Sequence, residues 1–597
     1  MSARSSVLLC LSSAVLTLSL SACFSHEASP EAAPAGAVSD ASAPAPEQTA
    51  GTATVSDQLE ALGYIDSPAT EAAEEAPVAT ATARTGATAG RAAPKSMKRK
   101  SKKADAGKGL VAQQREMDRR DYGAEDGDLD DATAMDGNTH TDHGVNPFTM
   151  TVDDALSTFS IDVDTASYSL ARRSLEGNRL PSQSAVRVEE FVNYFDYGSY
   201  AGPTDSTPFA VHMEAMPDPF RRGRHILRVG VQGKDVDRSQ RAPVHLTLLV
   251  DVSGSMSSAD KLGMAKQSLH MMVDQLREDD TVAIATYAGR TARVLEPTSA
   301  VNKRRIHNAI ENLSAGGSTA MSSGIDIAYD MAAQSFQKGH ENRVVVLSDG
   351  DANVGRTSWD DMLSQIKGHA DNGITLSTIG LGTGNYRDTL MEQLANKGDG
   401  NNFYIDSEAQ SQRVFVEQLP GTMVTIARDV KIQVEFHPES VKAYRLIGYE
   451  NRDIADQHFR NDRVDAGEIG AGHNVTALYE VILADDYAPE LATVRMRWEA
   501  PGADKAASEK AYVFPDRALR EASSQAHQDT RIAYASATFA EVLRGSPHAS
   551  EIDMASLMAF TEQAARPGED DDQELLSLMK RADRLGAGAR NMAVSSR

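Results

Sequence analysis

The chain has 597 residues and a formal net charge of −25, from 85 acidic and 60 basic residues. This length exceeds what one hydrophobic core serves, so we expect more than one domain. The acidic excess argues against nucleic acid as a partner, because neutralising phosphates requires a basic surface. An acidic surface favours solubility and the attraction of cations instead.

The first 22 residues have the pattern of an export signal. Val7–Ala22 is an apolar run of mainly Leu, Val, Ser and Ala, too short for a stable membrane span. The run ends in Leu20-Ser-Ala-Cys23, which resembles the lipobox of bacterial lipoproteins. That resemblance implies that residues 1–22 are a signal peptide and that Cys23 carries a lipid anchor to the membrane. Phe24 follows, where Asp would indicate inner-membrane retention, so we expect an outer-membrane location in the cell envelope.

Residues 23–145 are dominated by Ala, Pro, Ser, Thr, Glu and Gly, with few large apolar side chains. Such a segment buries too little surface to offset its chain entropy, so we expect a disordered N-terminal tether. Its charges are sorted into a basic block at Lys95–Lys103 and an acidic block at Asp121–Asp142. Both blocks are typical of a solvated spacer, although the basic one also suits anionic lipid or cell-wall polymer.

Residues 146–240 predict an N-terminal flanking domain that mixes strands and helices. Thr158–Thr165 alternates apolar and polar residues, which is typical of a half-buried strand. Asp162 and Asp164 then fall on its polar side, so we expect them at the surface or capping the next helix. The other elements are expected in this order: helices at Ala166–Glu176 and Val186–Tyr194, then strands at Phe209–Met216 and His225–Val231.

Residues 241–420 alternate buried-strand patterns with helical ones, which predicts a doubly wound parallel sheet of the Rossmann-like α/β class. Strands are expected at Pro243–Asp251, Val282–Tyr287, Arg343–Leu347, Ile374–Leu381 and Asn402–Asp406, with a short antiparallel edge at Ala292–Leu295. Helices are expected at Ser257–Leu276, Asn302–Leu313 and Met321–Gln337, and between Asp406 and Leu419.

Polar side chains follow the first of these strands. Asp251 ends its apolar run, and Ser253 and Ser255 come at two-residue steps. Open α/β sheets place ligand sites at the carboxyl ends of their strands, and carboxylate and hydroxyl oxygens suit a hard divalent cation. The alternative is that Asp251 caps the next helix and the serines form a turn.

Three segments in order resemble the von Willebrand factor type A (vWA) domain: Asp251-Val-Ser-Gly-Ser-Met, the Gly317-Ser-Thr loop and Leu347-Ser-Asp-Gly-Asp. The resemblance implies a metal-ion-dependent adhesion site that holds Mg²⁺ (or Ca²⁺ or Mn²⁺), with an open coordination position for a Glu or Asp of a protein partner. The ligands it implies are Asp251, Ser253, Ser255, Thr319 and Asp349, with Ser318 as the alternative to Thr319.

Residues 421–597 predict a C-terminal domain. Asp429–Phe436, Thr476–Leu483 and Thr493–Trp498 alternate, as strands of an antiparallel sheet with one wet face do. Our hypothesis is that they pair with the strands in Phe209–Val231, so that the vWA domain is flanked by, or inserted in, a β-sandwich. Amphipathic helices are expected at Arg517–Leu543, Met554–Ala564 and Gln573–Leu585. From about residue 146 to the end, the chain resembles bacterial vWA-domain lipoproteins.

Three kinds of function remain open. The favoured one is a binding protein of the bacterial cell envelope that engages protein partners through the cation. In a second, the protein is a structural scaffold and the metal only stabilises the loops. In the third, Ser258 and Lys261 form the Ser-x-x-Lys pair of a serine hydrolase. No Ser-Asp-Asn or Lys-Thr-Gly follows, so we expect no enzyme.

Overall fold

The computed structural model describes residues 140–589, except 199, 238, 240, 318–320, 352–357, 383–386, 419–420, 422–423, 489 and 502–505. The predicted signal peptide, Cys23, nearly all of the predicted tether, and the loop residues Ser318 and Thr319 lie outside this part of the chain. All the described residues belong to one compact unit, Ser56–Arg597. Within the described ranges, no helix has the length and apolar character that crossing a membrane requires.

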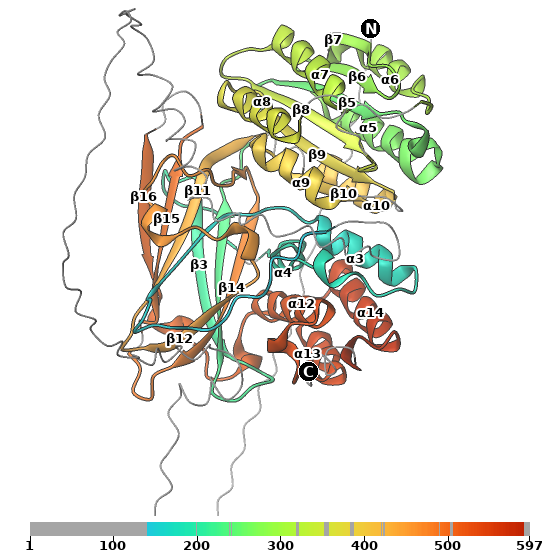
Figure 1. Ribbon diagram of the computed structural model, residues 1–597. Coiled ribbons are helices and arrows are strands. Elements are labelled where there is room, and N and C mark those ends of the chain that lie inside the picture. The colour runs from blue at the N-terminus through green and yellow to red at the C-terminus, as the bar shows by residue number, and fades with distance from the viewer. Residues whose placement is uncertain are drawn as a thin grey trace, which may run out of the picture. The chain divides into compact units, whose positions relative to one another are not determined.

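A six-stranded sheet forms the α/β part, in the order β10-β9-β8-β5-β6-β7 (Figure 1). Its strands are β5 (Val244–Asp251), β6 (Thr281–Tyr287), β7 (Ala292–Ser299), β8 (Glu341–Ser348), β9 (Thr375–Leu381) and β10 (Asn402–Ile405). Neighbouring strands are parallel except β7, which is the antiparallel edge. The predicted vWA-type parallel sheet is therefore confirmed.

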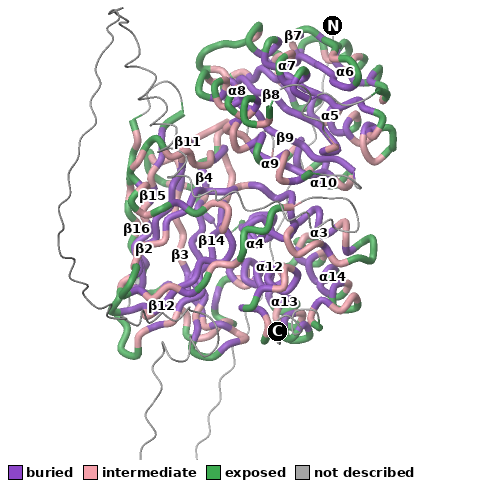
Figure 2. The backbone as a smooth tube through the Cα atoms, in the orientation of Figure 1, coloured by how far each residue is buried: buried purple, intermediate pink, exposed green. Residues whose placement is uncertain are grey.

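Helices cover both faces of this sheet, because its central strands carry apolar side chains in both directions. Leu248 and Val250 of β5 belong to one apolar cluster and Leu249 to another, and every residue of β5 is buried (Figure 2). The helices and helical turns are η2 (Gly254–Ser257), η3 (Ala259–Gly263), α5 (Met264–Gln275), η4 (Ala300–Asn302), α6 (Lys303–Glu311), α7 (Met321–Ser335), α8 (Trp359–Asp371), α9 (Asp388–Lys397), α10 (Glu408–Gln412) and η5 (Arg413–Gln418). The helix predicted from Ser257 becomes regular α-helix only at Met264, after the π-helical turn η3.

Two further sheets form from strands on both sides of the α/β part, in the orders β1-β12-β14-β4-β3 and β13-β11-β15-β16, with β2 beside β11. The strands are β1 (Thr149–Met150), β2 (Leu156–Ser160), β3 (Phe209–Pro217), β4 (His225–Gly233), β11 (Thr425–Phe436), β12 (Val441–Ile447), β13 (Ile469–Gly470), β14 (Asn474–Leu483), β15 (Ala492–Glu499) and β16 (Ala507–Val513). Because β4 pairs with β14 and β2 with β11, the α/β part is inserted between strands that share sheets.

The wet face predicted for β11 is wrong. Lys431 and Gln433, on its polar side, are both buried. Lys431 Nζ donates to the Asn461 carbonyl over 2.8 Å, and Gln433 Nε2 donates to Thr158 Oγ1 over 2.9 Å. The neighbouring strand β2 and the segment around Asn461 therefore satisfy polar groups that the alternation assigns to water.

The helices outside the α/β part share one core. They are α3 (Ala166–Glu176), α4 (Val188–Val192), α12 (Gln528–Arg544), α13 (Met554–Ala564) and α14 (Asp570–Arg584). One apolar cluster includes Tyr168 of α3, Phe191 of α4 and Phe539 of α12. The helix predicted from Arg517 is wrong at its start, because Arg520 N–H donates to the Ala215 carbonyl of β3 and α12 begins only at Gln528.

The expectation that Asp162 and Asp164 lie at the surface is also wrong. Only 4% and 2% of these residues are exposed. Arg452 lies 3.1 Å from Asp162 and 3.2 Å from Asp164, and the Asn402 N–H of β10 donates to Asp164 Oδ1 over 2.8 Å. The polar side of this stretch is thus covered by Arg452 and by β10 of the α/β part, to which the Asp164 carboxylate is bonded.

Candidate functional site

The predicted site begins where β5 ends. Asp251 is fully buried there, and its carboxylate shapes the following loop. Oδ1 accepts a hydrogen bond from Ser253 N–H over 2.8 Å, and Oδ2 accepts one from Ser348 Oγ over 3.1 Å. The loop then folds back so that Ser253 Oγ and Ser255 Oγ are 2.8 Å apart. The two-residue spacing of these serines therefore delivers both hydroxyls to one place.

Asp349 reaches the same edge of the sheet from the neighbouring strand. β5 and β8 are parallel, with Val250 opposite Leu347, so the two strands end together at Asp251 and Ser348, and Asp349 follows directly. Burial, and then the nearby charge of Asp349, raise the pKa of Asp251. Asp349 itself is only 2% exposed. The structure thus brings together four of the five predicted ligands.

The loop that carries the fifth predicted ligand begins beside the serines. Gly316 N–H donates to the Val252 carbonyl over 2.7 Å, and the Gly317 carbonyl accepts from Gly254 N–H over 3.0 Å. Gly317 has φ of +100°, and a Cβ there would lie 2.9 Å from the Gly289 nitrogen, so glycine allows this close approach. Thr319 follows outside the described residues, and its role stays a prediction.

The donors at this edge are of the kind that hard divalent cations prefer, namely carboxylate and hydroxyl oxygens. Asp251 and Asp349 supply two buried negative charges, and one ammonium, that of Lys261, lies against Asp349. Carboxylates therefore outnumber ammonium groups at this edge, and the residues fit a divalent cation. Among the described residues, no group of three or more His, Cys, Asp or Glu is arranged to hold a metal. The Asp251 edge is a different kind of site, with two carboxylates and the rest hydroxyls.

Lys261 is the residue at this site whose position the sequence did not reveal. Its Nζ donates to Asp349 Oδ2 over 2.8 Å, across 88 residues of sequence. Ser258 stands at the N-cap position of η3 but makes no side-chain bond to the helix backbone; its hydroxyl instead bonds Asp260, and this bond lowers the pKa of Asp260. Lys261 is therefore committed to Asp349, and these contacts do not favour a Ser258–Lys261 hydrolase pair.

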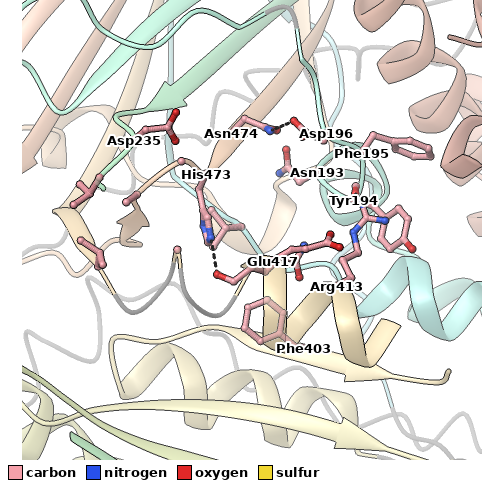
Figure 3. A pocket seen from close by; sticks show the side chains of 17 residues that line it. Asn193, Tyr194, Phe195, Asp196, Asp235, Phe403, Arg413, Glu417, His473 and Asn474 are labelled. Atoms are coloured by element: carbon pink, nitrogen blue, oxygen red, sulfur yellow. Dashed lines mark hydrogen bonds between the residues drawn. The ribbon is translucent and has the colours of Figure 1, made fainter. Parts of the chain in front are cut away.

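A second candidate is a pocket of about 330 Å³, whose described lining includes no residue of the Asp251 or Asp349 loops (Figure 3). Several of its polar groups are paired within the protein. Arg413 Nη1 donates to Asp571 Oδ2 over 2.7 Å, and Asn474 Nδ2 donates to Asp196 Oδ1 over 3.0 Å. Burial lowers the pKa of His473 to about 4, so its ring is neutral at pH 7. The Asp251 edge, with two buried carboxylates and one ammonium, remains the better candidate.

Comparison with known families agrees with this geometry. Residues 245–418 match the model of the von Willebrand factor type A domain, and residues 134–228 match a model described as von Willebrand factor. Residues 421–585 match a model described as the C-terminal part of the uncharacterized protein YfbK. The fold and the arrangement of Asp251, Ser253, Ser255 and Asp349 thus define a vWA-domain protein.

The chain is 37% identical over 467 residues to the uncharacterized protein YfbK of Escherichia coli, which covers 73% of this chain and 80% of YfbK. It therefore belongs to the YfbK-like family of bacterial vWA-domain proteins. It is also 27% identical over 290 residues to the uncharacterized protein sll0103 of Synechocystis, covering 46% of this chain and 66% of that protein.

Among solved structures, a von Willebrand factor type A protein from Catenulispora acidiphila is 15% identical, with a TM-score of 0.37, covering 67% of this chain and 89% of that one. The ArnB paralog VWA2 from Sulfolobus acidocaldarius is likewise 15% identical, with a TM-score of 0.30, covering 64% of this chain and 99% of that one. Similarities at this level carry no argument about function.

Proposed function

We propose that this chain is a lipid-anchored binding protein of the bacterial cell envelope, which engages protein partners through a divalent cation. The observation that carries the proposal is the convergence of Asp251, Ser253, Ser255 and Asp349 on one edge of the parallel sheet. Thr319 completes the proposed ligand set. Membership of a vWA-domain family supports a role in protein interaction.

The chemistry of the donors explains how such a site would bind. Mg²⁺ takes about six oxygen ligands near 2.1 Å and gives up its water reluctantly, while Ca²⁺ and Mn²⁺ also suit oxygen ligands. The hydroxyls of Ser253, Ser255 and Thr319 carry no charge, so an ion held mainly by them keeps much of its positive charge. A Glu or Asp carboxylate of a partner protein is the ligand that such an ion attracts most strongly.

The proposed location follows from the N-terminal sequence. A lipid on Cys23 would hold the protein at a membrane, and the tether to residue 145 would let the site reach away from it. Phe24 favours the outer membrane. Two of the relatives, from Escherichia coli and Synechocystis, are bacterial, which agrees with an envelope of this kind.

A structural scaffold is the second candidate, in which the metal would only hold the loops. The described loops are already joined by contacts of the chain itself. Gly254 N–H donates to the Gly317 carbonyl, and Lys261 pairs with Asp349. These contacts favour a binding role, because they hold the loops in place without a metal.

The test is capture of partner proteins from a cell-envelope extract in Mg²⁺, followed by release with EDTA. Wild type is compared with the Asp251→Ala and Asp349→Ala variants, whose folding is checked by circular dichroism. Asp279→Ala is the matched control, because this exposed carboxylate pairs with Arg277 before β6, at the opposite edge of the sheet. The proposal is supported if the folded Asp251→Ala and Asp349→Ala variants lose EDTA-reversible capture while Asp279→Ala keeps it. Unfolding of both variants favours the scaffold, and unchanged capture contradicts metal-dependent binding.

A further inference from the structure

The Lys261 ammonium lies on a predicted cation ligand. Its Nζ is 2.8 Å from Asp349 Oδ2, and the side chains of Lys261 and Asp349 are 13% and 1% exposed. The other oxygen, Asp349 Oδ1, accepts from Asp351 N–H over 3.2 Å. A flexible, positively charged side chain therefore occupies the carboxylate oxygen that is otherwise available to a cation.

The fold guides the Lys261 stem to this position. Gly382 lies directly against the stem, since a Cβ on Gly382 would be only 2.4 Å from Lys261 Cγ. The Tyr404 hydroxyl donates to the Gly382 carbonyl and so fixes this backbone beside Lys261. A larger side chain at position 382 would push the lysine aside.

Lys261 also sits on an unusual helical turn that is anchored from outside the α/β part. The turn η3 is π-helical, and single π-turns occur frequently at functional sites. The neighbouring residue Asp260 accepts from Arg173 Nη2 of α3 over 2.7 Å. The flanking helix therefore helps to hold the turn that presents Lys261 to Asp349.

An ammonium and a divalent cation cannot both lie against Asp349 Oδ2, because two positive charges at contact distance repel strongly in a site of low dielectric. We propose that Lys261 is an intrinsic counter-ion of Asp349, which competes with the divalent cation and so sets the cation affinity of the site. This inference rests on the proposed function. Lysine suits the role, since its point charge on a four-carbon stem can swing away from the site.

The first test is calorimetric titration of Mn²⁺ into wild type, Lys261→Met and Lys266→Met. Lys266→Met is the matched control, because it also removes one positive charge. Lys266 lies on the next turn, where its Nζ donates to the Glu311 carbonyl. Lys261→Met should bind Mn²⁺ at least about tenfold more tightly than wild type does. In this variant the cation does not have to break the charge-assisted hydrogen bond between Lys261 and Asp349. Lys266→Met should bind as wild type does.

The outcomes separate this inference from the proposed function. If wild type binds Mn²⁺ and Lys261→Met binds it no more tightly, competition by Lys261 is overturned while the cation site stands. If wild type binds no Mn²⁺, the proposed function itself fails, and the inference fails with it.

A second test uses wild type alone and does not depend on how Lys261→Met folds. Lysines are labelled with an amine-reactive reagent in EDTA and in saturating Mg²⁺, and the rate at each site is followed by mass spectrometry. Lys261 should react several-fold faster in Mg²⁺, because the cation displaces its amine from Asp349, while Lys266 should react equally in both. An unchanged rate at Lys261 in protein that binds the cation would overturn the inference.

Discussion

A buried carboxylate on β14 gives the sharpest prediction about the ion pairs that stabilise the flanking sheet. Glu480 is fully buried and accepts from Arg224 Nη1 over 2.6 Å and from Arg445 Nη2 over 2.8 Å. A third guanidinium, that of Arg221, lies 3.0 Å away. Glu480→Gln keeps nearly the same shape but removes the negative charge, leaving three buried cations without this counter-charge.

The expected cost can be worked from the pKa of this carboxyl. Burial alone would raise the pKa of Glu480, but the charges of Arg221, Arg445 and Arg224 outweigh it and lower the pKa from 4.5 to about 2. That shift corresponds to about 3 kcal/mol at 1.36 kcal/mol per pKa unit. Breaking a buried ion pair costs about 3 to 5 kcal/mol, which agrees. Because the pKa is lowered on folding, this stability is fully present above the unfolded pKa of 4.5 and is lost as the pH falls toward 2.

The assay is denaturant unfolding of wild type and Glu480→Gln at pH 7 and at several lower pH values. The control is Glu509→Gln on β16, whose exposed pair with Arg460 is worth at most about 1 kcal/mol. The deficit of Glu480→Gln should be largest at pH 7 and should shrink below pH 4.5. A Glu480→Gln protein as stable as the control, or a deficit that does not change with pH, would refute this reasoning.

Two further predictions concern packing and the junction between the parts of the fold. Arg187→Met removes the guanidinium that donates to Asp388 of α9 over 2.6 Å. The free energy of unfolding, measured in denaturant, should fall by about 3 kcal/mol. A variant that is as stable as wild type would show that this pair is dispensable. Gly230→Ala places a methyl 2.3 Å from the Tyr200 ring and should lower the free energy of unfolding by about 1 to 3 kcal/mol. In Gly368→Ala, on α8, the added methyl meets no atom within 4 Å and should stabilise the protein by up to about 1 kcal/mol. Equal melting temperatures of the two variants would contradict both expectations.

The parallel sheet and its polar edge could be predicted because they depend on local signals. The apolar run that ends at Asp251 predicts a strand buried on both faces, and every residue of β5 is buried. The two-residue steps to Ser253 and Ser255 place hydroxyls on the loop beyond that strand, and the two hydroxyls do meet. Asp349 is indicated by the resemblance to the vWA domain, and the parallel pairing of β5 with β8 places the end of its strand at the same edge.

Features that depend on distant partners could not be predicted in this way. Alternation assigns Asp162 and Asp164 to a polar face, but it cannot reveal that the α/β part and Arg452 cover that face. The contact of Lys261 with Asp349 joins residues 88 positions apart. Lys261 lies on a π-helical turn, and no periodic pattern in the sequence predicts such a turn. In both cases the deciding contacts come from residues that are distant in the sequence.

The most direct test of the central claim is a calorimetric titration of Mn²⁺ into wild type, Asp251→Ala, Thr319→Val and the Asp279→Ala control. The proposed site predicts a single binding event in wild type and in Asp279→Ala, its loss in Asp251→Ala and its weakening in Thr319→Val. The absence of Mn²⁺ binding by wild type, or binding that survives Asp251→Ala unchanged, would contradict a cation site at the end of β5.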